Sequence, residues 1–173
     1  MSIKINYLKN ANNNPSANLV LFCNEKFNIT NLKKHLSESE FSYISDLLKN
    51  NDLKKNLFVF EVNSKKNIVL ISIKNNLKSS DIENLGAELY GRINFGKDCE
   101  YFVNSDSIVG KYDNLLGHFL HGLKLKSYEF NKYKSKKETR LISINVFGNK
   151  NKPSAQHQLK FKAIEEGTFF ARD

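Results

Sequence analysis

Apolar side chains recur at intervals of three and four residues in several stretches of the chain, which is the spacing of helices that bury one face. The clearest stretch comprises Ile82, Leu85, Gly86, Leu89 and Ile93. Similar spacing predicts helices over residues 30–36, 39–49, 115–123 and 153–173. The residues expected to start these helices are Ser37 or Ser39, Ser80 in a capping box with Glu83, Asp113 or Asn114, and Pro153.

Short apolar or alternating runs lie between the helical stretches and predict strands. These runs are residues 3–7, 19–23, 57–62, 68–73, 100–103 and 141–147. Residues 19–23 are apolar throughout, as in a strand that is buried on both faces of a parallel sheet. A short polar link between 57–62 and 68–73 predicts a hairpin. We therefore expect an α/β domain with a mixed, mostly parallel sheet and helices on both faces.

The length of 173 residues suits one domain with a proper hydrophobic core. We expect residues 1–150 to form the α/β domain, and residues 151–173 to begin a linker helix toward a further domain that this chain lacks. The apolar stripe of that helix continues almost to the last residue and comprises Leu159, Ala163, Ile164, Gly167, Phe170 and Ala171. A stripe that is still running at the end suggests a helix cut in mid-element.

The chain is basic, with 27 lysines and arginines against 18 acidic residues and a net charge of +9. Nearly all of this excess is lysine spread along the chain, which predicts a solvated basic surface rather than a dedicated polyanion site. The densest basic run is a possible nucleic-acid contact because aromatic residues precede it. Its members are Lys132, Lys134, Lys136, Lys137 and Arg140. An exposed helix-to-strand connection is the alternative interpretation.

Other features indicate the compartment. Cys23 and Cys99 form no CxxC pair, and we expect two buried thiols in a reducing compartment. The N-terminus has no apolar run typical of a signal peptide, and no later run is long enough to cross a bilayer. We expect a cytoplasmic protein without membrane contact.

No catalytic, cofactor-binding or metal residue is predicted from the motifs. The stretch Gly91–Asp98 nearly fits a phosphate-binding loop, but it ends in an aspartate and follows a predicted helix instead of a strand. His118 and His121 lie three residues apart, yet a metal needs three or four ligands, and no carboxylate lies within a turn on that face. We expect both histidines at the flank or surface of their helix.

Besides the helix expected from Ile82 to Ile93, two segments resemble the N-terminal domain of the leucine (cytosol) aminopeptidase family. The first is the glycine-leucine helix and its aromatic exit, with Gly122, Leu123, Leu125, Tyr128, Phe130, Tyr133 and Lys134. The second is the triplet Ala171, Arg172 and Asp173, which in full-length members leads into the catalytic domain. The resemblance covers most of the chain and is more specific from about Ile71 onward.

The resemblance implies a macro-domain-like fold and a cytoplasmic, homohexameric parent enzyme. Members of the family remove N-terminal residues from peptides with two divalent metal ions, usually zinc or manganese, which are held in the C-terminal domain. No segment here matches the metal-binding motif of that domain, so no site residue is carried over. In some bacterial relatives the N-terminal domain also contributes to DNA binding.

We therefore interpret the chain as a non-catalytic N-terminal domain, inactive alone, that takes part in assembly and in access to the active centres of its parent. Its expected partner is its own catalytic domain. Two alternatives are a DNA-binding module that uses the basic run, and a macro-like domain that binds ADP-ribose. The second alternative lacks the glycine-rich phosphate loop that such binders need, since the eight glycines are scattered.

Overall fold

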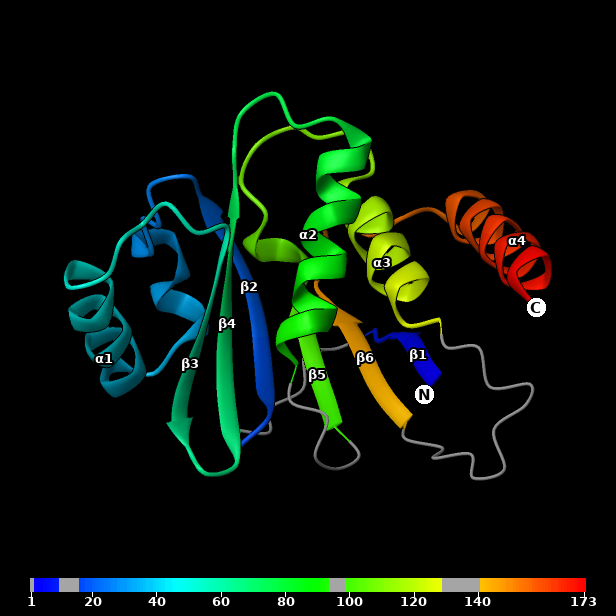
Figure 1. Ribbon diagram of the computed structural model, residues 1–173. Helices are drawn as coiled ribbons and strands as arrows, with labels where there is room; N and C mark the ends of the chain where they lie inside the picture. The colour runs from blue at the N-terminus through cyan, green and yellow to red at the C-terminus, as the bar shows by residue number, and fades with distance from the viewer. Residues whose placement is uncertain (1, 10–15, 94–98, 129–140) are drawn as a thin grey trace.

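The computed structural model describes residues 2–9, 16–93, 99–128 and 141–173 (Figure 1). These residues form a six-stranded sheet in the order β1-β6-β5-β2-β4-β3. The strands are β1 (Ser2–Tyr7), β2 (Asn18–Asn24), β3 (Leu57–Asn63), β4 (Lys66–Ile73), β5 (Cys99–Asn104) and β6 (Leu141–Phe147). Every neighbouring pair is parallel except β3 with β4, which form an antiparallel hairpin. The predicted mixed, mostly parallel sheet is confirmed.

The helices cover both faces of this sheet, as predicted. They are α1 (Glu38–Lys49), α2 (Ser79–Arg92), α3 (Leu115–Lys126) and α4 (Ala155–Arg172), with short 3₁₀ turns at Thr30–His35 and Ser105–Ser107. One hydrophobic core lies between the sheet and the α2–α3 pair, and the other lies between the sheet and α1. Figure 1 shows α2 and α3 side by side over one face, with α1 beyond β3 and α4 beyond α3.

The central strand β2 is buried on both faces, as its unbroken apolar sequence predicted. Val20 and Phe22 belong to the core beneath α2 and α3, whereas Leu21 and Cys23 belong to the core beneath α1. The thiol of Cys23 lies 3.5 Å from the carbonyl oxygen of Ile71, and burial raises its pKa to about 12. Cys23 is therefore a packed thiol, and Cys99 is only half-buried.

The helices α2 and α3 approach each other so closely that glycine is required at two positions. A Cβ atom added to Gly86 of α2 would overlap the carbonyl oxygen of Phe119, and one added to Gly122 of α3 would overlap that of Glu83. Both obstacles are backbone atoms, which cannot rotate away as a side chain could. The predicted apolar stripe of α2 is confirmed, since all of its members are buried.

The expected helix starts are only partly correct. Ser37 caps α1 in a capping box with Glu40. Ser80 is wrong as the N-cap, because α2 begins at Ser79 with Lys78 in the N-cap position. The carboxylate of Asp81 accepts the backbone N–H of Lys78. Pro153 is also not the first helical residue, since Ser154 caps α4.

The start of α3 is unusual. Asn114 occupies the predicted N-cap position but has a left-handed backbone, with φ of 51°, and its side chain makes no capping hydrogen bond. Asparagine tolerates this conformation better than most residues.

The helix α4 presents a different face to the domain than its apolar stripe predicts. Leu159, Ile164 and Phe170 point to solvent, with Phe170 84% exposed. The inward positions are Gln158, Phe161, Glu165, Thr168 and Phe169. The predicted stripe is wrong because α4 has apolar residues on both sides, and contacts with α3 decide which side is buried.

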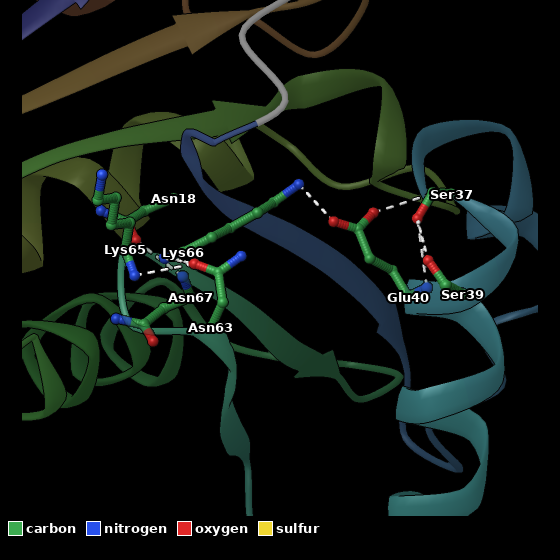
Figure 2. Close-up of polar contacts among 8 residues, drawn as sticks. All are labelled: Asn18, Ser37, Ser39, Glu40, Asn63, Lys65, Lys66 and Asn67. Carbon is green, nitrogen blue, oxygen red and sulfur yellow. Dashed lines mark hydrogen bonds and ion pairs between the residues drawn. The ribbon is translucent and has the colours of Figure 1, made fainter.

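A buried ion pair joins the β3–β4 hairpin to α1 (Figure 2). The Nζ of Lys66 lies 2.5 Å from Oε1 of Glu40, and the two side chains are only 9% and 13% exposed. The other carboxylate oxygen of Glu40 accepts the backbone N–H of Ser37 at 2.9 Å. Burial alone would raise the pKa of Glu40, but these hydrogen bonds outweigh it, so the pKa lies below its ordinary value.

We expect Gly122→Ala to lower the free energy of unfolding by about 2 to 3 kcal/mol, because the added methyl group must displace the backbone of α2. Urea denaturation followed by circular dichroism measures the change. The matched control is Gly91→Ala, since Gly91 also lies in a helix but has open space around its Cα. Equal stability of the two variants would contradict the close helix contact.

The Glu40 pair predicts a loss of stability in acid. The unfolded chain takes up a proton near the ordinary glutamate pKa of about 4.3, whereas folded Glu40 resists protonation. The contribution is therefore complete above that pH and is lost as the pH falls through the lowered native pKa. Urea denaturation between about pH 3 and pH 6 should give a steeper pH dependence for the wild type than for Glu40→Gln. Glu38→Gln, at an exposed position in the same helical turn, should leave the slope unchanged.

Candidate functional site

Polar side chains on α3 connect this helix to α2 on one side and to α4 on the other. Nδ1 of His118 lies 2.9 Å from Oε1 of Glu83 in α2, with both side chains partly exposed. The ring of His118 also meets Phe161 of α4 edge-on, with 5.1 Å between ring centroids. This histidine lies at the flank of its helix, as expected from the sequence.

One turn further along, His121 is buried, which contradicts the expected flank or surface position. Its Nδ1 lies 2.9 Å from Oε1 of Glu165 in α4, and the two side chains are 6% and 7% exposed. The imidazole ring also packs on Phe161, with 4.8 Å between ring centroids. The carboxylate partner comes from another helix, 44 residues away, so spacing within one helix gave no signal of it.

Glu165 is the centre of this group. Its second oxygen, Oε2, lies 3.3 Å from Nζ of Lys124 on α3. Tyr7 of β1 lines the same recess, and its pKa is raised to about 12, first by burial and then by the negative charge of Glu165. The recess has a volume of about 160 Å³ and lies between α3, α4 and β1.

A third connection lies where α3 ends. The ring of Tyr128 stacks on Phe169 with 5.1 Å between centroids, and its hydroxyl donates to Oδ1 of Asp173 at 2.6 Å. That hydrogen bond is the main cause of the raised pKa of Tyr128. The guanidinium of Arg172 lies 5.5 Å from the centre of the same ring. Two of the segments that carry the family resemblance are therefore in direct contact.

The side chains described above join α3 to α2 and to α4. Their arrangement indicates a role in packing these helices and not in catalysis. Glu165 is already engaged by His121 and Lys124, and the recess would accommodate only a very small molecule. In the part of the chain that the structure describes, no group of three or more histidine, cysteine, aspartate or glutamate side chains is placed to hold a metal ion. The observed interactions of the site hold α4 against α3.

A second polar group lies at the carboxyl ends of β2 and β5, where open α/β sheets commonly bind ligands. Nδ2 of Asn104 donates to Nδ1 of His35 at 3.0 Å, and Ser107 Oγ accepts the backbone N–H of Phe22 at 3.0 Å. Burial, and then the charge of Lys34, lower the pKa of His35. Nε2 of His35 and Oγ of Ser105 are buried and have no hydrogen-bond partner among the described residues. ADP-ribose binding stays a prediction.

The predicted nucleic-acid contact, Lys132 to Arg140, lies outside the described residues and also stays a prediction. Gly91 lies inside α2, as expected if the phosphate-loop-like stretch starts in a helix, and residues 94–98 lie outside the described part. None of the helices in the described ranges is both long and apolar enough to cross a membrane.

A comparison with solved structures finds a similar fold in a mutant of tomato leucine aminopeptidase. The match has a TM-score of 0.63 at 14% sequence identity, and it covers 95% of this chain and 36% of the aminopeptidase chain. This chain thus spans about a third of the length of that structure. At this level of identity the match shows a shared α/β fold. No family model matches the sequence, and no curated protein does.

We expect Glu165→Leu to lower the free energy of unfolding by about 3 kcal/mol, because His121 and Lys124 lose their buried acceptor. The double variant His121→Leu/Glu165→Leu should recover part of this loss, because the buried imidazole that the single variant leaves without its acceptor is then also removed. Urea denaturation measures stability, and hydrogen exchange reports whether α4 opens.

Glu166→Leu is the matched control, because Glu166 is the exposed neighbour in the same helix. An equal loss in the Glu165 and Glu166 variants would refute the docking role of this pair.

Proposed function

We propose that this chain is a non-catalytic N-terminal domain of a leucine-aminopeptidase-type enzyme, and that it acts in assembly and in access to the active centres. The observation that carries the proposal is the fold match, which takes in nearly all of this chain but only about a third of the aminopeptidase chain. The remaining two thirds of such a chain leave room for a separate catalytic part.

The docking of α4 on α3 supports the same proposal. His121 with Glu165, and Tyr128 with Asp173, fix the direction of the last helix relative to the sheet. A helix whose direction is fixed in this way would hold a following domain at a defined angle. In the proposed parent, the two divalent metal ions, manganese or zinc, and the peptide substrate belong to that following domain. The proposal also places the parent in the cytoplasm as a homohexamer.

The test compares the 173-residue chain with the same chain extended by its catalytic domain. We expect the short chain to release no detectable product from a leucine anilide substrate in the presence of Mn²⁺ or Zn²⁺, and the extended chain to be active. Removal of the N-terminal domain from the extended chain should change its oligomeric state, measured by light scattering. Peptidase activity that stays with the short chain after unfolding, repurification and refolding would refute the proposal.

A further inference from the structure

The strands β5 and β6 end side by side. They are parallel, and Asn104, the last residue of β5, is the register partner of Phe147, the last residue of β6. The residues that follow the two strands therefore meet at the carboxyl edge of the sheet, where open α/β sheets commonly bind ligands. The 3₁₀ turn Ser105–Ser107 follows β5, and Gly148 follows β6.

Two successive backbone N–H groups after β6 point at one carboxylate oxygen. Oδ1 of Asp106 accepts the N–H of Asn149 at 2.8 Å and the N–H of Lys150 at 2.7 Å. Consecutive N–H groups that converge in this way form an anion-binding concavity, of the kind that holds phosphate groups in other proteins. Here the anion is a side chain of the same chain.

The close contact between the two segments depends on Gly148. Its φ of 120° lies in a region that favours glycine. A Cβ atom added to Gly148 would lie 2.3 Å from Oγ of Ser105 and 3.0 Å from Cγ of Asp106. Both side chains therefore lie directly against the start of the loop that supplies the N–H groups.

Two further polar atoms in this region are buried without a hydrogen-bond partner among the described residues. They are Oγ of Ser105, a residue with no exposed surface, and Nε2 of His35. The proton of neutral His35 lies on Nε2, because Nδ1 accepts from Asn104, whose Oδ1 is already engaged by the N–H of Asp106. Nε2 is therefore an unused donor.

The donors of this region outnumber what one carboxylate satisfies. Asp106 uses Oδ1 for both backbone N–H groups, and neither of its oxygens reaches Ser105 or His35. A phosphate group carries more acceptor oxygens than a carboxylate, and its hydrogen bonds to such donors are charge-assisted and strong. The unused donors thus favour phosphate as the class of ligand for which the site is suited.

We propose that the loop from Gly148 to Lys150 is a phosphate-binding site that the chain keeps closed with the carboxylate of Asp106. The side chain occupies the two N–H groups, and its negative charge repels a second anion. Removal of this carboxylate opens the site.

This inference does not depend on the proposed aminopeptidase function. It bears on the ADP-ribose alternative, because the phosphates of that ligand would meet an occupied and negatively charged site. The competing explanation is that Asp106 only closes the turn between β6 and α4. In that case its removal would weaken the fold without creating affinity for an anion, and the experiments below distinguish the two.

The first experiment follows the backbone N–H resonances of Asn149 and Lys150 by NMR during a titration with inorganic phosphate at constant ionic strength. We expect them to stay in place in the wild type. In Asp106→Ala they should shift and saturate with a dissociation constant on the order of millimolar, at least about tenfold tighter than in the wild type. The titration is repeated with ADP-ribose, which should leave the wild-type resonances unmoved.

Two variants serve as controls for this titration. Asp52→Ala changes the net charge equally and removes an exposed carboxylate that also accepts a backbone N–H, so it should behave as the wild type. Asp106→Asn keeps an oxygen acceptor in place and should also leave the site closed. Shifts of Asn149 and Lys150 in the wild type, or equal shifts in Asp52→Ala and Asp106→Ala, would overturn the proposal.

The second experiment remains decisive if Asp106→Ala folds poorly. Phosphate stabilises proteins in general because it is excluded from their surface, so the reference is Gly122→Ala, a variant weakened at a distant position. The urea midpoint of Asp106→Ala should rise more with phosphate concentration than that of Gly122→Ala, because binding to the folded state adds to the general effect. An equal rise in the two variants would refute the site.

Discussion

The contact between α2 and α3 determines the layer on one side of the sheet. Two glycines, Gly86 and Gly122, allow backbone to meet backbone, so the two helices behave as a single layer over the core. Because α3 is fixed in this way, its opposite side has a defined position toward α4. The places of His121 and Lys124, and with them the place of Glu165, follow from that contact.

Buried polar pairs lie at the junctions between segments that are distant in sequence. Glu40 and Lys66 are 26 residues apart and connect α1 to the hairpin, while His121 and Glu165 connect α3 to α4. Such pairs add little net stability compared with apolar contacts of the same volume. They do penalise any arrangement in which one partner is buried alone. Their effect in this fold is to select one orientation of a helix among several that would bury similar apolar area.

Sequence patterns predicted the strands, the hairpin and α2 because the apolar residues of each are concentrated on the face or faces that it turns to the core. The face of α4 was not predictable in this way. Phe161 and Phe169 compete with Leu159, Ile164 and Phe170 on the opposite side, and a glutamate that would ordinarily be assigned to solvent decides the outcome. The burial of His121 had no local signal either, since its partner lies on another helix. The start of α2 was misassigned because Asp81 provides a capping carboxylate ahead of Glu83.

The pairing of β1 with β6 has a consequence for how the chain folds. The Nδ2 of Asn6 donates to Oδ1 of Asn145, a separation of 139 residues. Among the strands that the structure describes, β1 pairs with β6 alone, the last of them in chain order. Contacts of such high sequence separation form late and slow the folding of a domain. During synthesis the apolar side chains of Ile3 and Ile5 have no sheet partner until nearly the whole domain has left the ribosome. The residues of β1 are thus made long before their partners in β6.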